Sequence, residues 1–159
     1  MAATQNVFDW LPCSVVFISA AHEGRRDIMT ATAMFVSEKE PLVIVSVAKN
    51  HLSEQLINQS GRFAITIAAE GQQQLAIRIG STKGETTDKF DKLSIKSIEK
   101  TTAKVPIPEG SAAWLSCEVE SSYDIDGYRI FLGRVKDYKD LDAPPLVWQK
   151  NKFFGLKSL

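Results

Sequence analysis

One segment of the chain brings together residue types that bind anions. Ser46 ends a run of β-branched residues, and Ala48-Lys49-Asn50 leads from it toward a helix that begins near Ser53. A lysine, hydroxyl groups and the unpaired backbone N–H groups of a helix N-terminus together suit a phosphate group. An ordinary capped helix beside a solvated lysine explains the same residues without a ligand. The segment therefore suggests an anion site and leaves its occupant open.

Other catalytic patterns are missing from the sequence. Cys13 and Cys117 stand far apart, without a C-x-x-C motif or neighbouring histidines, so we expect two buried free thiols and no metal. His22 and His51 match no nucleophile pattern, and no catalytic triad is predicted. The segment Gly80-Ser81-Thr82-Lys83-Gly84 has the wrong order and spacing for a P-loop. On its own it is typical of a flexible surface loop.

Length and composition bound the class of protein. The chain has 159 residues, 44% of them hydrophobic, and 19 basic residues balance 19 acidic ones. A single domain over residues 1–159 is the expectation. The zero net charge gives no overall field for nucleic acid or an anionic membrane. The apolar runs are shorter than the ~20 residues of a membrane helix, and no signal-peptide pattern is visible, so we expect a cytoplasmic protein.

The elements that position the anion segment are mostly strands. Short β-branched runs at 14–19 and 42–47 predict two of them. Residues 27–36, between turn-like flanks, are predicted as one strand. Residues 62–68 alternate between apolar and polar side chains and predict another.

Two short helices are expected among the strands. The first covers about 52–57, with Asn50 or Ser53 as its N-cap and Gly61 in the left-handed position after its end. The second covers 72–79, because its apolar residues recur at helical spacing.

A β-hairpin is predicted around Asp126-Gly127, since this dipeptide suits a type I′ turn. Ile125 then faces Tyr128, and the register continues until Ser121 faces Leu132. One face of the hairpin is predicted to be the core face, and it collects Leu115, Cys117, Val119, Tyr123, Ile125, Tyr128, Ile130 and Leu132.

The hairpin continues with one irregularity. Arg134 would fall on the core side unless Gly133 marks a β-bulge. Five to seven strands, two short helices and no alternation of strands with helices predict a β-barrel or sandwich.

At this level of detail the sequence resembles a known family, the flavin reductase-like, FMN-binding split-barrel proteins. The resemblance covers about residues 12–136. It rests on the order and spacing of the segments 12–20, 27–33, 36–37, 40–43, 46–53, 60–65, 88–90, 115–119 and 130–135. The resemblance implies a mainly β fold, a six-stranded antiparallel Greek-key split barrel with a few short helices. It also implies a homodimer with FMN near the subunit interface.

The resemblance further implies which residues bind the flavin. Four line the isoalloxazine ring and ribityl chain: Met29, Thr30, Ala31 and Thr32. Five hold the phosphate: Ser46, Ala48, Lys49, Asn50 and Ser53. Lys89 and Phe90 belong to a loop that closes over the flavin, with Lys89 near polar groups of the cofactor and Phe90 near its ring.

The activity implied by the resemblance is hydride transfer from NADH or NADPH to flavin, a reaction in which the cofactor carries the chemistry. This chain departs from the family at Gly127-Tyr128, where Asp-His is common, and at Arg134, where the family has Glu. A non-enzymatic FMN carrier or electron-transfer protein served by a redox partner is therefore kept as an alternative. A β-barrel interaction module without flavin is a third. The aromatic tail within 145–159 is predicted to pack on the barrel or on a second subunit.

Overall fold

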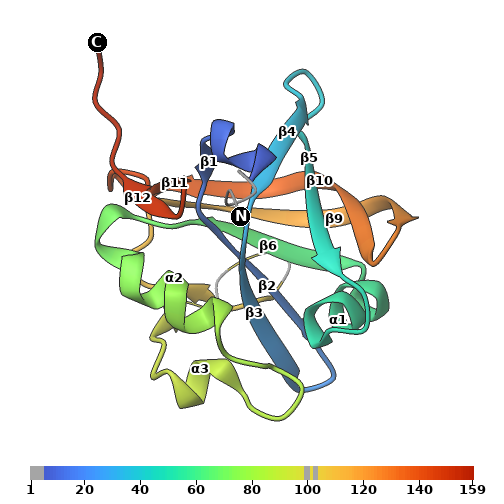
Figure 1. Cartoon of the computed structure of the whole chain (residues 1–159). Coiled ribbons are helices and arrows are strands. Elements are labelled where there is room, and N and C mark those ends of the chain that lie inside the picture. Colours follow the sequence, from blue (N-terminus) through green and yellow to red (C-terminus); the bar gives the residue numbers. More distant parts are fainter. Residues whose placement is uncertain (1–5, 99–100, 102–103) are drawn as a thin grey trace, which may run out of the picture.

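The computed structural model describes residues 6–98, 101 and 104–159, and most of its strands belong to one antiparallel sheet (Figure 1). The sheet has seven strands in the order β3-β2-β6-β9-β10-β5-β4. Their bounds are β2 (Val16–His22), β3 (Arg25–Ala31), β4 (Ala33–Ser37), β5 (Leu42–Ala48), β6 (Arg62–Ile67), β9 (Ala113–Ile125) and β10 (Tyr128–Asp140).

Smaller elements surround this sheet. Two small sheets are made of β1 (Cys13–Ser14), β11 (Val147–Gln149) and β12 (Lys152–Phe154), and of β7 (Ser97–Ile98) and β8 (Ile107–Pro108). The helices are η1 (Val7–Trp10), α1 (Leu52–Ser60), η2 (Glu70–Gln72), α2 (Gln73–Gly80) and α3 (Lys89–Lys92).

The mainly β fold with few helices is confirmed, but the prediction of six strands is wrong. The segment 27–36 was predicted as one strand, and the structure divides it at Thr32 into β3 and β4. These two strands occupy opposite edges of the seven-stranded sheet although a single residue separates them along the chain. The sheet must therefore curl until its two edges meet at Thr32, which is how a sheet closes into a barrel.

Of the three buried hydrophobic clusters among the described residues, two support the site, one inside the barrel and one outside it. The inner cluster includes Val43, Val45 and Val47 of β5, which alternate toward the barrel interior, and Leu56 and Ile57 of α1, which cover it. Each such side chain contributes roughly 1.5–3 kcal/mol when fully buried.

The outer cluster lies between the sheet and the helices α2 and α3. It joins Phe17 of β2 and Ile28 of β3 to Ile79 of α2 and Phe90 of α3, with Trp148 and Phe153 of the C-terminal hairpin packed against it. This cluster fixes α2 and α3 against β3, so the loop between the two helices has anchored ends.

The predicted hairpin register is confirmed, but its core face near the tip is wrong. Ile125 pairs with Tyr128 and Ser121 with Leu132, and the register shifts between Leu132 and Gly133 as a bulge requires. Tyr123, Ile125 and Tyr128 are exposed, whereas Phe131 on the opposite face is fully buried. The reason is that β10 also pairs with β5 and places Phe131 opposite the buried Val45, so this face points into the barrel.

Two smaller predictions also need correction. The N-cap of α1 is His51, without a side-chain capping bond, rather than Asn50 or Ser53, while Gly61 ends the helix in the left-handed conformation as expected. Cys117 is buried as predicted, but Cys13 is only half-buried in its short edge strand β1.

Candidate functional site

Two adjoining cavities lie where β3, α2 and the C-terminal end of β5 meet, and they share Met29, Thr30 and Gly80. The first, here called the polar cavity, has a volume of about 310 Å³. Its other lining residues are Asp27, Val47, Ala48, His51, Ser53, Ile79, Ser81, Thr82, Lys83, Gly84, Glu85 and Lys89. The second, the apolar cavity, has a volume of about 560 Å³. Its other lining residues are Val15, Ala31, Thr32, Ser46, Ala76, Ile77, Tyr128, Trp148 and Phe153.

Eight of the eleven residues expected to bind flavin line these cavities. Those in the polar cavity are Met29, Thr30, Ala48, Ser53 and Lys89. Those in the apolar cavity are Met29, Thr30, Ala31, Thr32 and Ser46. Strand β3 supplies residues to both cavities, so it forms the floor that connects them.

The other three expected residues, Lys49, Asn50 and Phe90, are not among the residues that line the cavities. The ammonium group of Lys49 is 2.9 Å from the Asp124 carboxylate of the hairpin. Asn50 is exposed and has a positive φ of 67°, in the turn that leads to α1. Phe90 is buried in the outer core cluster, where the guanidinium carbon of Arg26 lies 4.8 Å from its ring centroid. A packed ring of this kind supports the loop without facing a ligand.

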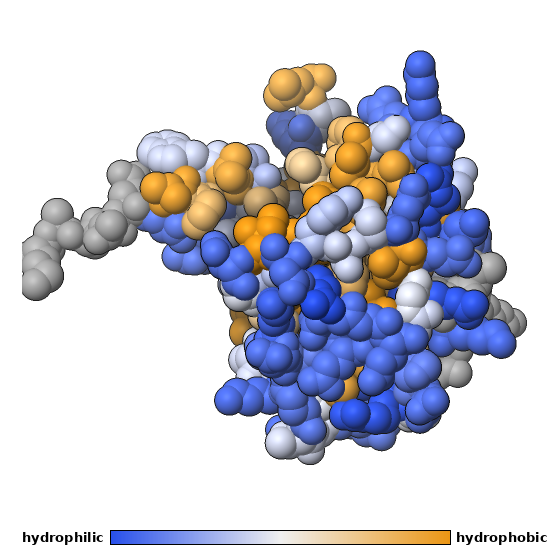
Figure 2. All heavy atoms as spheres, turned by 90° about the vertical axis from the view of Figure 1, so that its right-hand side faces the viewer, coloured by the Kyte–Doolittle hydropathy of each residue, from blue (hydrophilic) through white to orange (hydrophobic). Residues whose placement is uncertain are grey.

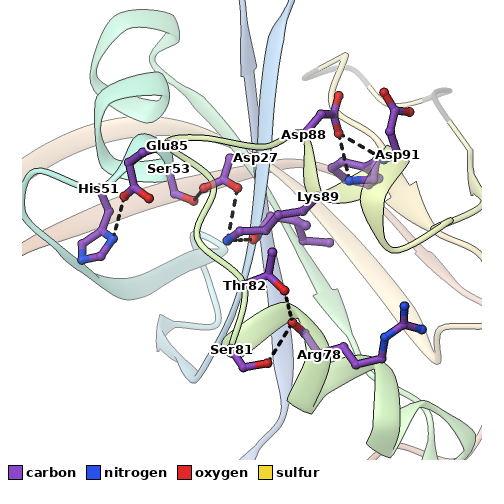
Figure 3. A network of polar contacts seen from close by, with 12 residues as sticks. Asp27, His51, Ser53, Arg78, Ser81, Thr82, Glu85, Asp88, Lys89 and Asp91 are labelled. Carbon is purple, nitrogen blue, oxygen red and sulfur yellow. Dashed lines mark hydrogen bonds and ion pairs between the residues drawn. The ribbon is translucent and has the colours of Figure 1, made fainter.

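A buried charge network forms one wall of the polar cavity (Figure 3). Lys89 Nζ lies 3.2 Å from Asp27 Oδ1 and donates a hydrogen bond of 2.6 Å to the backbone carbonyl of Ile28. Ser53 donates from its hydroxyl to the other oxygen of Asp27 at 2.6 Å. The side chains of Asp27 and Lys89 are only 4% and 6% exposed. Ser53 and Lys89 therefore have their polar groups engaged at this wall, and a ligand meets a nearly neutral pair.

The N-terminus of α1 receives a carboxylate from the facing loop. Glu85 lies 3.0 Å from Nδ1 of the N-cap residue His51, as Figure 3 shows. The pKa of Glu85 is lowered by a hydrogen bond from its own backbone N–H, and further by His51 and by the backbone N–H of Leu52, against a smaller opposing effect of burial. This contact fits the general preference of helix N-termini for anions.

The loop from Ser81 to Glu85 is the part of the site that sequence reasoning missed. It follows α2 directly, and the hydroxyl of Thr82 donates to the carbonyl of Arg78 at 2.7 Å, which fixes the start of the loop. A Cβ atom at Gly84 would collide with the Asp27 carboxylate, so glycine permits the close approach of loop and strand. The order of its residues excluded a P-loop. Two hydroxyl residues and a lysine directly after a predicted helix could nevertheless have indicated that this loop lines a polar site.

Aromatic residues of the apolar cavity were also missed as site residues. Tyr128 comes from the start of β10, while Trp148 and Phe153 come from the C-terminal hairpin. No local pattern connects these segments, because only the sheet pairing brings them together.

Neither a metal site nor a membrane helix is found in residues 6–98, 101 and 104–159. This part of the chain contains no cluster of three or more histidine, cysteine or acidic side chains suited to a metal. It also contains no helix that is both long and apolar enough to cross a bilayer.

A curled antiparallel sheet with a two-part cavity, polar at one end and aromatic at the other, defines a small-ligand-binding protein. Comparison with known proteins identifies the family within this class. Residues 9–157 match the flavin reductase-like domain family. The chain belongs to this family.

Curated relatives agree with this assignment. The reductase subunit HsaB of a flavin-dependent monooxygenase from Mycobacterium tuberculosis is 30% identical over 125 residues, which cover 77% of this chain and 64% of that protein. This chain thus spans less than two thirds of that relative. An NADH-dependent FAD reductase from Streptomyces globisporus is 26% identical over 82% of this chain and 71% of that protein.

Solved structures show the same fold. The NADH:FAD oxidoreductase SgcE6 of Streptomyces globisporus superposes with a TM-score of 0.87 at 23% identity, over 96% of this chain and 90% of that one. An FMN-binding protein from Thermus thermophilus superposes with a TM-score of 0.83 at 21% identity, over 98% and 92% of the two chains.

Proposed function

We propose that this protein is a flavin reductase that transfers hydride from NADH or NADPH to a flavin. The observation that carries the proposal is the division of one continuous site into an aromatic, apolar end and a polar end beside the start of α1. A flavin has the same division, with a flat ring at one end and a phosphate at the other. The names of the curated relatives given above support the same activity.

The two cavities suggest how the FMN portion of the flavin is held. The isoalloxazine ring fits the apolar cavity, where Ala31 and Thr32 offer small side chains and Trp148 and Phe153 offer aromatic surface. The phosphate fits the polar cavity, where Lys83 lies on the loop that lines the cavity together with the start of α1. The hydroxyls of Ser81 and Thr82 in the same loop donate to the carbonyl of Arg78. This arrangement replaces Lys49 with Lys83 as the cation that neutralises the phosphate.

When bound, the flavin supplies the hydride-accepting chemistry, so the protein needs no acid–base triad. The residues of this chain instead bind and orient. The floor strand β3 positions the ring, the aromatic side chains exclude water from it, and the loop from Ser81 to Glu85 covers the polar end.

A homodimer is part of the proposal, and an exposed apolar surface supports it. On the face shown in Figure 2, hydrophobic residues gather in the upper half. Exposed apolar side chains of β4 and of the hairpin tip are Met34, Phe35, Val36, Tyr123, Ile125 and Tyr128, each more than half exposed. Apolar surface of this kind marks an interaction site. Tyr128 also lines the apolar cavity, so a second subunit on this surface would approach the ring.

A redox partner in the cytoplasm completes the proposal. HsaB is named as the reductase subunit of a flavin-dependent monooxygenase. By analogy, reduced flavin formed here would be used by a separate oxygenase.

An absorbance spectrum between about 300 and 550 nm tests the activity. The purified protein is incubated with excess flavin, desalted, and then mixed with NADH or NADPH under argon. We expect flavin to be retained and to bleach, or to be turned over as a substrate in a steady-state assay. Retained flavin that nicotinamide does not reduce would instead support the electron-carrier alternative.

A further inference from the structure

Arg129, the second residue of β10, forms ion pairs with two different parts of the structure. Its Nε lies 2.7 Å from Oδ1 of Asp124, the residue that faces it across the hairpin of β9 and β10. Its Nη1 lies 3.0 Å from Oε1 of Glu54, which belongs to the first turn of α1. The planar guanidinium group can donate to two carboxylates at once. Arg129 therefore connects the start of α1 to the hairpin.

The carboxylate of Glu54 depends on this ion pair for its counter-charge. The side chain of Glu54 is only 9% exposed. Asn58, one turn further along α1, donates a hydrogen bond of 2.6 Å to the same oxygen. Among the described residues, Arg129 is the only cation that forms an ion pair with Glu54. Because a nearly buried carboxylate is costly without a counter-charge, the contact with Arg129 holds the first turn of α1 against the hairpin.

The two connected elements supply residues to both ends of the flavin site. Tyr128, beside Arg129, lines the apolar cavity and pairs with Ala48, which lines the polar cavity. Ser53, beside Glu54, also lines the polar cavity. In Figure 1, α1 lies at the end of β5 that carries Ala48. The floor strand β3 connects the two cavities directly, and the Arg129–Glu54 ion pair adds a second connection between their walls.

We propose that Arg129 is a positioning residue for flavin binding. It holds the start of α1 at the distance from the hairpin that lets the phosphate and the ring of one flavin bind together. The inference rests on the proposed function and adds a residue that lines neither cavity. A ligand that spans both ends of the site depends on their separation, and holding that separation fixed before binding lowers the cost of binding. The effect should therefore appear with FMN and not with riboflavin, which lacks the phosphate.

The test compares FMN and riboflavin binding to the full-length protein by equilibrium titration. Arg129→Met removes the ion pair and leaves Glu54 without a counter-charge. Glu54→Met removes the same ion pair from the α1 side, and Arg129 keeps its contact with Asp124, so no buried carboxylate is left unpaired. In both variants we expect the FMN affinity to fall by about fivefold and the riboflavin affinity to stay within twofold. The rate of flavin reduction by NADH or NADPH at saturating FMN should also stay within twofold.

Arg134→Met is the matched control. Arg134 lies on the same strand, and it forms ion pairs of 2.6 Å with Glu40 and 2.7 Å with Glu120. Its side chain is 33% exposed, close to the 25% of Arg129, and it lines neither cavity. This variant reproduces the loss of two ion pairs from β10, and we expect it to bind FMN and riboflavin as the wild-type protein does.

The outcomes separate positioning from general stability and from the proposed function. A loss of FMN affinity in only one of the two test variants would show that the ion pair itself does not position the flavin. An unchanged FMN affinity in both, an equal loss for FMN and riboflavin, or the same loss in Arg134→Met would likewise overturn the inference and leave the reductase intact. A wild-type protein that binds and reduces no flavin would instead reject the proposed function.

Discussion

The hydroxyl of Ser53 donates a hydrogen bond of 2.6 Å to the carboxylate of Asp27. This bond joins the first turn of α1 to strand β3 and lies beside the ion pair of Asp27 with Lys89. The polar end of the cavity therefore has a rigid wall, made by residues from three elements. Lys83 lies on the loop across the cavity and makes no hydrogen bond or ion pair with the described residues, and this leads to the first prediction.

Lys83→Gln should weaken FMN binding by about tenfold, because a charge-assisted contact to the phosphate is lost. Riboflavin, which has no phosphate, should bind the variant and the wild-type protein equally. The measurement is a fluorescence titration with each flavin.

The matched control for this prediction is Lys49→Gln. Lys49 pairs with Asp124 near the partly exposed tip of the hairpin, so its loss should change FMN affinity by less than twofold. If Lys49→Gln weakened FMN binding and Lys83→Gln did not, the original assignment of the phosphate to Lys49 would be correct.

Lys89→Met should reduce the free energy of unfolding by about 3 kcal/mol, because it leaves the buried Asp27 carboxylate without its counter-charge. The double variant Asp27→Asn/Lys89→Met should recover part of this loss, since neither side chain is then charged and Ser53 keeps an acceptor. Urea denaturation measures both. A loss below 1 kcal/mol in the single variant would show that water or another group compensates Asp27.

Gly133→Ala should be destabilising by about 1–3 kcal/mol because the barrel interior has no room for the added methyl group. A Cβ atom there would lie 2.5 Å from Cζ of Phe63 and 3.2 Å from Cβ of Cys117. Gly127→Ala is the control, since nothing lies within 4 Å of a Cβ atom at the hairpin turn. Thermal denaturation should show a lower Tm for the first variant only. Equal Tm values would contradict the close packing.

The stability of the protein should fall at alkaline pH more steeply with Cys117 than without it. Burial raises the pKa of the Cys117 thiol to about 12. Between the ordinary thiol pKa of about 8.5 and pH 12, only the unfolded state ionises this group, so the folded state loses relative stability as pH rises. Relative to Cys117→Ala, the wild-type protein should lose between about 1 and 2 kcal/mol from pH 7 to pH 10. If the stability of the wild-type protein and of Cys117→Ala changed with pH in the same way, the raised pKa of Cys117 would be refuted.

Short sequence patterns predicted the features that depend on neighbouring residues alone, namely turns and helix ends. Asp126-Gly127 correctly predicted the turn and the register as far as Leu132, although the turn is not of type I′ because Asp126 has a positive φ and Gly127 does not. Gly61 marks the end of α1. The buried face of the hairpin tip could not be predicted in this way. It depends on β5, which pairs with β10 and turns Phe131 inward, and this neighbour lies more than 80 residues earlier in the chain.

In the candidate site, too, residues within one segment were predicted, whereas contacts between distant segments were not. Residues of β3 that line the cavities were predicted because they form one continuous segment with a family pattern. Lys49 was assigned to the phosphate from its place beside a helix start, but its direction depends on Asp124, which the sequence does not place nearby. Trp148 and Phe153 reach the apolar cavity through the pairing of β1 with β11 and through the backbone bonds of Leu146 to Val15 and Ala68.

The division of the segment 27–36 at Thr32 has a consequence for how the barrel is held closed. Strands β3 and β4 are the first and last strands of the sheet, and Thr32 joins them covalently. Thr32 is thus the point at which the covalent chain connects the two edge strands of the sheet. A circular permutation that opened the chain at Thr32 and joined its present termini would leave every strand intact and still release the two edges of the sheet. Because Thr32 also lines the apolar cavity, the ring of a bound flavin would lie against this connection and help to hold the two edge strands together.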